Sequence, residues 1–313
     1  MRIAILGAGA MGILFGGCLS QENQTWLVDV NQERVKTITD KGVKIREMDG
    51  TDRLFYPGAV TDTADLPQMD LVIIFVKAMF TREALEANRN LIGPDTYLMT
   101  LQNGAGHEKQ LLAFVDRSHV IIGSTQHNSS ILADGYVNHG GGGRTAIGLL
   151  GGSGSCLQKI ADTFTTCGFD CVISDQVQYQ IWDKLFLNTA ASSLTAILQV
   201  PLGFILEDSY ACEIMEKLAR EAVAVANAMG MRDFQAERVI EDIKNVLSHS
   251  RGGYTSIYAD IKNGLHTEVD TISGSVVEAA KEVQIPVPCH ELVVSLIHAM
   301  EDKEKLVGKG QSS

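Results

Sequence analysis

The sequence predicts an α/β fold in which a doubly wound Rossmann sheet is followed by a domain made only of helices. Up to about residue 175, short apolar runs alternate with helical patterns, which is typical of a mostly parallel sheet with helices on both faces. From about residue 178 the apolar period is helical. We therefore place a dinucleotide-binding domain at 1–177 and a helical substrate or dimerisation domain at 178–313. A ligand is expected in the crevice between them, at the carboxyl ends of the strands.

The first predicted strand, Arg2–Leu6, leads directly into a glycine-rich turn. Gly7, Gly9 and Gly12 have the G-x-G-x-x-G spacing of a dinucleotide-binding turn. The first glycine permits the tight turn, the second lets the backbone approach a pyrophosphate, and the third lets the helix pack closely on the strand. The pyrophosphate would bind the free N–H groups at the start of the next helix. The predicted cofactor-binding residues of this turn are Gly7, Ala8, Gly9, Ala10, Met11 and Gly12.

The second strand, Thr25–Asp29, ends in an acidic residue about 20 residues beyond the glycines. At this position a carboxylate accepts hydrogen bonds from an adenosine ribose. The same carboxylate would repel the additional phosphate of NADP, which carries nearly two negative charges. Arg34 is near in sequence, but we expect it in the following helix. Asp29 therefore predicts NAD as the cofactor, in preference to NADP.

Three further strands are predicted in order along the chain: Leu71–Val76, Tyr97–Leu101 and Val120–Gly123. Gly135–Leu150 is predicted as a hairpin with Gly140–Gly143 at its turn. These glycines lack the Lys-Ser/Thr ending of a phosphate-binding loop, so a turn is the better interpretation.

The helical half contains one segment with clear start and stop signals. Asp208 or Ser209 can cap a helix that ends before Gly230. Its apolar face comprises Ala211, Ile214, Met215, Leu218, Ala222, Val225 and Met229. Further helices are predicted near 178–198, 233–250, 254–263, 268–284 and 290–306.

The composition excludes several classes of partner. The net charge of −12 argues against nucleic acid or an anionic membrane, because both bind basic surfaces. The chain has no apolar stretch of membrane-spanning length, and its N-terminus is predicted as a core strand rather than a secretory signal. The six cysteines form no C-x-x-C pair, and neither they nor the eight histidines show metal-ligand spacing. We expect a cytoplasmic protein with buried thiols and no metal.

Polar residues stand at strand ends and on one helix where a plain core would not have them. Lys77 ends an apolar strand, and Asn103-Gly104 follows another, although an exposed strand end and a common turn are the ordinary alternatives. Lys184 and Asn188 are four residues apart and share one face of an apolar helix. A partly buried lysine there needs a partner.

The segment His266-Thr-Glu268-Val-Asp270 is predicted at the start of a helix and is preceded by Ser256 and Asp260. Glu268 could be the partner of Lys184. The alternative is a solvated carboxylate that interacts with the helix dipole.

Together and in this order, these motifs resemble the ketopantoate reductase family over essentially the whole chain. The resemblance rests on Gly7-Ala-Gly-Ala-Met-Gly12, Lys77, Asn103-Gly104, Trp182-x-Lys184 with Asn188, Ser256 and His266-Thr-Glu268-Val-Asp270. It implies an N-terminal Rossmann domain, a C-terminal helical domain and an active site in the cleft between them. Other β-hydroxyacid dehydrogenases also combine such domains, but the segment 266–270 fits them less well.

The resemblance also implies residue roles. In the family, the lysine matching Lys184 is the general acid, and the glutamate matching Glu268 supports it. Residues matching Lys77 and Asn103 line the cofactor and the substrate, and the serine matching Ser256 holds the substrate. The expected catalytic residues are thus Lys184 and Glu268. The expected cofactor contacts outside the glycine turn are Asp29, Lys77, Asn103 and Glu268, and the expected substrate contacts are Asn103, Lys184, Asn188 and Ser256.

The chemistry agrees with these roles. Hydride transfer to a 2-keto carbon produces an alkoxide, which a nearby ammonium stabilises and protonates. Acid catalysis of this kind contributes about 10²–10⁴-fold to the rate. A carboxylate partner would keep the lysine charged and correctly aimed.

The chain departs from the family pattern in two respects. Members that use NADP typically have an arginine just after the second strand, where this chain has Asp29-Val30-Asn31. Positions at which pantoate-forming members carry asparagine around the substrate are Ser192, Leu202 and Gly253 here. Such a pocket has lost hydrogen bonds to a hydroxylated substrate and gained apolar surface.

We therefore expect a reductase that converts bulky or branched 2-keto acids to D-2-hydroxy acids, similar to the NAD-dependent D-2-hydroxyacid (D-mandelate-type) dehydrogenases. The alternative is a 2-dehydropantoate 2-reductase that makes D-pantoate. A non-catalytic nicotinamide-sensing protein would need neither Lys184 nor Glu268. The oligomeric state is left open, and a homodimer through the helical half is compatible with the family.

Overall fold

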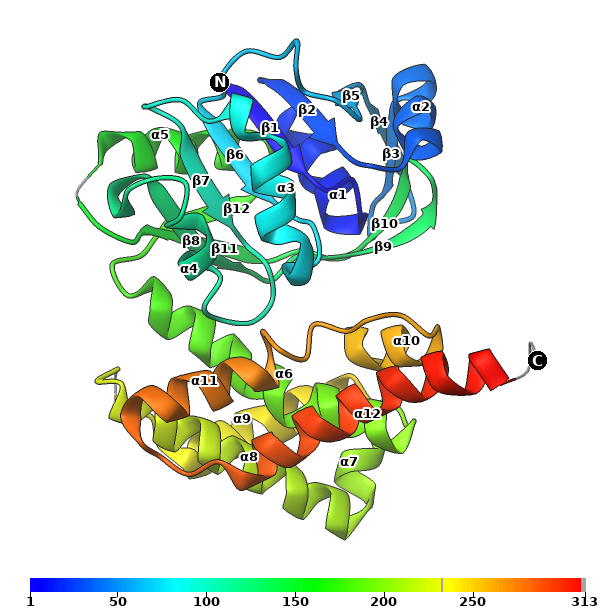
Figure 1. The fold of residues 1–313 in the computed structure, drawn as a ribbon, viewed down its shortest axis with the longest axis vertical. Coiled ribbons are helices and arrows are strands. Elements are labelled where there is room, and N and C mark those ends of the chain that lie inside the picture. Colours follow the sequence, from blue (N-terminus) through cyan, green and yellow to red (C-terminus); the bar gives the residue numbers. More distant parts are fainter. Residues whose placement is uncertain (153, 232, 311–313) are drawn as a thin grey trace. The chain divides into compact units, whose positions relative to one another are not determined.

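The computed structural model describes residues 1–152, 154–231 and 233–310. The chain forms two compact units, shown in Figure 1. The first comprises Met1–Gln102 and His107–Gln180, and the second comprises Asn103–Gly106 and Ile181–Ser313. The change of unit therefore falls within the first turn of helix α6 (Val177–Leu198). The short segment 103–106 belongs with the helices, although it follows a strand.

An eight-stranded sheet forms the framework of the first unit, in the order β12-β11-β8-β7-β6-β1-β2-β5. Neighbouring strands run parallel except for the antiparallel pair β11 and β8. The mostly parallel sheet is thus confirmed, with β1 in its interior. The strands are β1 (Arg2–Leu6), β2 (Gln24–Val28), β5 (Gly58–Val60), β6 (Leu71–Ile74), β7 (Tyr97–Thr100), β8 (Val120–Thr125), β11 (Arg144–Leu149) and β12 (Asp170–Ile173).

A second sheet in this unit was not predicted. Its order is β4-β3-β10-β9, and its strands are β3 (Val43–Arg46), β4 (Asp52–Phe55), β9 (Asn128–Ala133) and β10 (Tyr136–Gly141). Most residues of β4 and β9 are exposed. These strands therefore lack the apolar runs and the regular alternation by which strands are recognised in a sequence.

The predicted hairpin over Gly135–Leu150 is wrong. Its two strands lie in different sheets, because β10 pairs with β9 and β3, whereas β11 pairs with β8 and β12. Gly142 and Gly143 connect the two sheets instead of forming a turn within one. The actual hairpin joins β9 to β10 through Asp134 and Gly135, and Gly135 adopts the positive φ of 70° that glycine tolerates best.

Helix α1 (Ala10–Leu19) lies between the two sheets, and two adjacent glycines permit this packing. A methyl group on Gly16 would lie 2.6 Å from Leu27 in the large sheet. A methyl group on Gly17 would lie 2.9 Å from Val43 in the small sheet. Any larger side chain at either position would push a sheet away from the helix, and so the helix that follows the glycine turn is fixed on two sides.

The other helices of the first unit are short. They are α2 (Gln32–Lys41), α3 (Thr81–Ala87), α4 (Glu108–Leu111), α5 (Ser155–Thr166) and the 3-10 turns η1 (Ala78–Phe80), η2 (Arg89–Leu91) and η3 (Arg117–His119). One hydrophobic core joins α1, both sheets and α5. At its centre the rings of Phe15 and Phe169 stack with their centroids 4.2 Å apart.

The second unit is helical, as predicted. Its helices are α6 (Val177–Leu198), α7 (Phe204–Glu207), α8 (Ser209–Ala228), α9 (Ala236–His249), α10 (Ser256–Lys262), α11 (Ser273–Val283) and α12 (Pro288–Gly310). Asp208, rather than Ser209, caps α8, because its carboxylate accepts the N–H of Ala211 at 2.8 Å. The predicted apolar face of α8 is buried except for Ile214 and Met229, which are 37% and 40% exposed.

Helix α11 begins later than predicted. Residue 268 has no regular structure, and residues 269–272 form turns instead of the first helical turn. Side chains bind the backbone here: the Thr267 hydroxyl accepts the N–H of Val269 at 3.2 Å, and the Thr271 hydroxyl donates to the carbonyl of Glu268 at 3.2 Å. Such bonds compete with helical ones. Glu268 therefore lies in an irregular loop and not, as predicted, at the start of a helix.

Two further observations bear on the composition. Within the residues that the structure describes, no helix is both long and apolar enough to cross a membrane. The described cysteines are free thiols, but only two of the six are buried as predicted. Cys18 and Cys167 are buried, whereas Cys156, Cys171, Cys212 and Cys289 are half-buried.

Candidate functional site

Two glycines of the N-terminal turn are required by packing. Gly7 has a φ of 102°, and a methyl group there would lie 2.7 Å from the backbone nitrogen of Val76. A methyl group on Gly12 would lie 1.9 Å from the carbonyl oxygen of Gly7. These contacts match the turn and the close packing for which the first and third glycines of the motif are needed.

The middle glycine is different, because open space surrounds it. No atom lies within 4 Å of a methyl group placed on Gly9. Gly9 is the N-cap of α1, whose first intrahelical bond is donated by Ile13 to the Gly9 carbonyl at 2.9 Å. The N–H groups before Ile13 have no acceptor within the helix. Backbone donors beside open space fit the pyrophosphate of a dinucleotide.

Asp29, directly after β2, binds the glycine turn. Its Oδ2 accepts the N–H of Ala8 at 2.8 Å, and its Oδ1 accepts the N–H of Asn31 at 2.9 Å. Arg34 lies in the following helix, as expected, but its Nη1 donates to Asp29 Oδ2 at 3.2 Å. The Nε of Arg34 donates to Asp134 at 3.1 Å. The sequence analysis missed this pairing: Arg34 stands in the first turn of α2, close to the end of β2, but Asp134 lies 100 residues further on.

Lys77 follows a shorter strand than predicted. Strand β6 ends at Ile74, and Lys77 is the N-cap of η1. The side chain of Gln102, at the end of β7, donates to the carbonyl of Val76 at 2.7 Å and lies 3.1 Å from the hydroxyl of Thr81. Gln102, which the sequence analysis did not single out, therefore ties together the loops that follow these two neighbouring strands.

The structure brings Lys184 and Asn103 together. Lys184 lies on α6, and its Nζ donates to Asn103 Oδ1 at 3.0 Å. Burial lowers the pKa of Lys184 to about 8. Asn188 is half-buried and follows one turn later on the same helix face. A lysine with this pKa retains its proton at neutral pH but releases it more readily than an exposed lysine.

The loop that carries Asn103 lies against the loop that carries Glu268. The N–H of Ala105 donates to the carbonyl of Thr271 at 3.0 Å. Gly104 permits the approach, because it has a φ of 102° and a methyl group there would lie 2.0 Å from the same carbonyl oxygen. The positions of Asn103 and of the half-buried Glu268 are thus coupled through a backbone contact.

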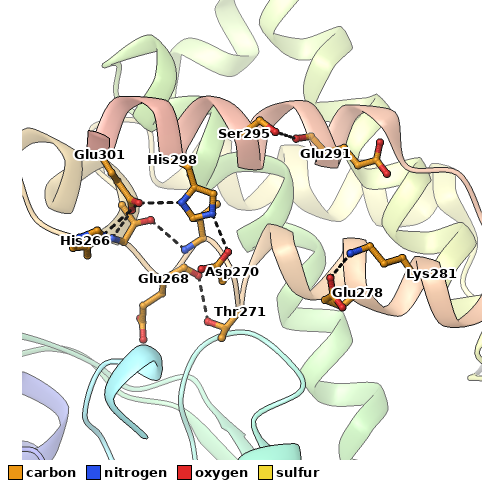
Figure 2. A network of polar contacts seen from close by, with 12 residues as sticks. His266, Glu268, Asp270, Thr271, Glu278, Lys281, Glu291, Ser295, His298 and Glu301 are labelled. Carbon is orange, nitrogen blue, oxygen red and sulfur yellow. Dashed lines mark hydrogen bonds and ion pairs between the residues drawn. The ribbon is translucent and has the colours of Figure 1, made fainter. Parts of the chain in front are cut away.

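Figure 2 shows how the Glu268 loop is held from α12. Glu301 accepts the N–H of Thr267 at 2.8 Å and lies 3.1 Å from His298. His298 also contacts Asp270 at 3.0 Å. The side chain of Glu268 points away from these groups in the figure. Glu301 and His298 escaped the sequence analysis, because no local pattern links α12 to a loop about thirty residues earlier.

The remaining predicted residues lie near α10. Ser256 is exposed and is the first residue of this helix, which Thr255 caps by accepting the N–H of Tyr258 at 3.2 Å. Leu202 and Gly253, two of the positions that depart from the family pattern, contact each other. The N–H of Leu202 donates to the carbonyl of Gly253 at 3.0 Å, and a methyl group on Gly253 would lie 3.2 Å from Leu202 Cδ1.

Comparison with known proteins gives matches over nearly the whole chain. The family Ketopantoate reductase PanE/ApbA matches residues 3–152, and Ketopantoate reductase PanE/ApbA C terminal matches residues 176–301. The 2-dehydropantoate 2-reductase of Pyrococcus abyssi is 31% identical over 310 residues, 99% of this chain and 100% of that protein. The enzyme of the same name from Halobacterium salinarum is 30% identical over 300 residues, 95% of this chain and 98% of that protein.

The solved structures agree with these matches. The ternary structure of D-mandelate dehydrogenase with NADH and anilino(oxo)acetate has a TM-score of 0.90 and 30% sequence identity, and the similarity covers 97% of this chain and 99% of that one. The glycine turn, the lysine on α6 and the two-unit architecture are thus found in a chain that matches one family over most of its length. This protein is a member of the ketopantoate reductase family of oxidoreductases.

Proposed function

We propose that this protein uses NADH to reduce a bulky or branched 2-keto acid to the D-2-hydroxy acid. The observation that carries the proposal is the partly buried Lys184, whose Nζ is held by Asn103 at 3.0 Å and whose pKa burial lowers to about 8. A group with this pKa can donate a proton at neutral pH. The glycine turn and the proton donor belong to different units of the chain, and the proposed reaction needs both.

A reduced nicotinamide, when bound, supplies the hydride that adds to the keto carbon. The chain's own residues manage the charge that then develops on the oxygen. The ammonium of Lys184 stabilises the alkoxide and donates the proton, and the Asn103 oxygen fixes the direction of that ammonium. We propose Glu268 as the carboxylate that supports Lys184, and Lys77 as a cofactor contact. Asn188 and Ser256 are proposed to contact the substrate.

The charges around Asp29 favour NAD over NADP. Arg34 is bound by two carboxylates, those of Asp29 and Asp134. Two carboxylates for one guanidinium leave a net negative charge where a 2′-phosphate would have to bind. Asp29 accepts three hydrogen bonds in the structure, and a carboxylate has about four acceptor positions, so it can still accept a ribose hydroxyl.

The contact between Leu202 and Gly253 supports an apolar substrate. A side chain at 253 would press on Leu202, because a methyl group there would lie 3.2 Å from Cδ1, so Leu202 would have to shift slightly. The two departures are therefore compatible with each other, since glycine at 253 leaves room for the Leu202 side chain. D-mandelate dehydrogenase, to which the chain is similar, was solved with anilino(oxo)acetate, an oxoacetate that carries an aromatic ring.

The alternative proposal is a 2-dehydropantoate 2-reductase. It is favoured by the names of the relatives from Pyrococcus abyssi and Halobacterium salinarum. Under this alternative, other polar groups replace the hydrogen bonds that Leu202 and Gly253 do not offer. The described cysteines are free thiols, which is compatible with a cytoplasmic location under either proposal.

Steady-state assays decide between the two. We would measure kcat/KM for ketopantoate, benzoylformate and 2-ketoisocaproate, each with NADH and with NADPH. Our proposal expects the highest value for one of the two apolar keto acids with NADH. A wide margin in favour of ketopantoate would establish the alternative, and a clear preference for NADPH would contradict the assignment of NAD. The variant Leu202→Asn is expected to improve the relative value for ketopantoate.

A further inference from the structure

Glu301 on α12 holds the loop that carries Glu268 by its backbone. Its Oε1 accepts the N–H of Thr267, the residue before Glu268, at 2.8 Å. Its Oε2 lies 3.1 Å from Nδ1 of His298 and 3.5 Å from Nδ1 of His266 (Figure 2). The side chain of Glu301 is only 6% exposed. A carboxylate so well shielded from water forms strong hydrogen bonds, and the N–H that it accepts is buried with Thr267.

His298 connects Glu301 to the other side of the same loop. Its Nε2 lies 3.0 Å from Oδ1 of Asp270, two residues beyond Glu268. Each ring nitrogen therefore faces a carboxylate, and both contacts are hydrogen bonds only when both nitrogens carry protons. Burial opposes the charged form of His298, but the hydrogen bonds to Glu301 and Asp270 outweigh it and raise the pKa of His298 above its ordinary value.

The held loop reaches the lysine site through the backbone. The carbonyl of Thr271, at the end of the loop, accepts the N–H of Ala105 at 3.0 Å. Asn103, two residues before Ala105, accepts the ammonium proton of Lys184 at 3.0 Å. A continuous series of described contacts thus runs from Glu301 to the ammonium group.

We propose that Glu301 and His298 are positioning residues, which fix the loop 266–271 and thereby set the positions of Glu268 and, through Thr271, of Asn103 beside Lys184. Neither residue takes part in the chemistry itself. The inference rests on the proposed function, because positioning has a consequence for turnover only if Lys184 and Glu268 act in the reaction. It adds to that function two residues on an element that contributes no predicted catalytic group.

Two substitutions of Glu301 separate the loss of its hydrogen bond to the Thr267 N–H from the loss of its charge. Glu301→Ala removes the acceptor of the Thr267 N–H, whereas Glu301→Gln keeps an oxygen that can accept it. The matched control is Glu278→Ala on α11, which removes an exposed carboxylate paired with Lys281 (Figure 2). We expect kcat to fall about tenfold in Glu301→Ala, to recover most of its value in Glu301→Gln, and to stay unchanged in the control.

Hydrogen exchange followed by mass spectrometry tests the positioning without using turnover. In Glu301→Ala, peptides that cover 264–272 and 103–106 should exchange faster than in the wild type, while the rest of the chain stays protected. A general loss of stability would instead raise exchange throughout the chain. The pH profile adds a second readout: loss of the Asn103 acceptor should move the alkaline limb of kcat/KM to lower pH, which a smaller fraction of folded enzyme cannot do.

The outcomes distinguish this inference from the proposed function. Wild-type turnover in both Lys184→Ala and Glu268→Gln would overturn the proposed function, whatever the exchange data show. If those variants lose turnover while Glu301→Ala matches the Glu278→Ala control in turnover and exchange, the positioning inference is wrong and the proposed function stands. Faster exchange at 264–272 with unchanged exchange at 103–106 would overturn the link to Asn103.

Discussion

The glycine turn and the lysine site are assembled in opposite ways. The turn uses residues 7–12 and Asp29, all within one strand, one helix and the next strand end, and its donors are backbone N–H groups. The lysine site joins α6 to loops that lie far away in the sequence, and its contacts involve side chains. The backbone site is therefore specified by local sequence, whereas the lysine site depends on tertiary packing. The following predictions test that contrast.

The largest effect is expected at the proton donor. Lys184→Ala should lower kcat by at least about 10² and leave the fold intact, because acid catalysis is lost without removal of a core side chain. Lys217→Ala is the control, since Lys217 is exposed on α8 and pairs with Glu213. Turnover and the melting temperature would be measured for both variants. If Lys184→Ala turns over at the wild-type rate, another group supplies the proton, and Lys184 is not the general acid.

The glycine turn should respond differently at two of its positions. Gly12→Ala brings a methyl group to within 1.9 Å of the Gly7 carbonyl and should destabilise the fold by about 2–3 kcal/mol. Gly9→Ala meets no neighbouring atom and should change the free energy of unfolding by less than about 1 kcal/mol.

In cofactor binding the order of the two variants should reverse, so that Gly9→Ala has the larger effect. Gly9→Ala fills the space proposed for the pyrophosphate and should raise the Kd for NADH about tenfold, as measured by titration of NADH fluorescence. Equal NADH affinity in Gly9→Ala and the wild type would show that the open space beside α1 is not where the cofactor binds.

The pH dependence of reduction should report Lys184. The folded-state pKa of about 8 lies below the ordinary value for lysine, so the ammonium is present below pH 8 and is lost as the pH rises through it. We expect kcat/KM for reduction to fall about tenfold per pH unit above that point. In Asn103→Ala the charged form loses an acceptor, and the fall should begin at lower pH. A flat profile from pH 6 to pH 10 would contradict the assignment of the acid.

The smallest effect is expected from Asp134, a distant residue whose side chain binds Arg34 beside the proposed cofactor site. Asp134→Ala removes a partner of Arg34 and should raise kcat/KM with NADPH about two- to fivefold, with little change for NADH. Asp52→Ala on β4 provides a control, since its carboxylate also pairs with surface cations but contacts neither Asp29 nor Arg34. An unchanged ratio of the two cofactors in Asp134→Ala would mean that the local residues alone decide the selectivity.

The same contrast explains how much the sequence could predict. The strands predicted from apolar runs agree with the structure to within two residues at each end, because runs such as Ile3–Leu6 are apolar and are buried in the sheet. The second sheet was missed, because strands such as β9 are mostly exposed and show no period. The sequence predicts a hairpin turn at Gly140–Gly143 because local sequence does not reveal that the chain passes there from one sheet to the other.

In the candidate site, too, the residues specified by local sequence could be predicted and the tertiary contacts could not. The glycines and Asp29 could be assigned from spacing alone. Lys184 and Asn103 could be named as candidates but not joined, because 81 residues separate them. The helical start predicted around Glu268 failed because two threonine hydroxyls bind the backbone and delay α11. Glu301 gave no signal of its link to the loop, since the group that it accepts there is a backbone N–H, which every residue type except proline provides.

The position of α1 between two sheets also affects how the protein folds while it is being synthesised. The residues of this helix from Gly12 to Leu19 are buried without interruption, partly by β10, which ends at Gly141. While the ribosome is still producing β9 and β10, the completed glycine turn is attached to a helix whose second apolar face is covered only in part, by β3 and β4. Nascent chains that end before β10 should therefore expose apolar surface of α1, and the proposed cofactor site should mature only after nearly half of the protein has been translated.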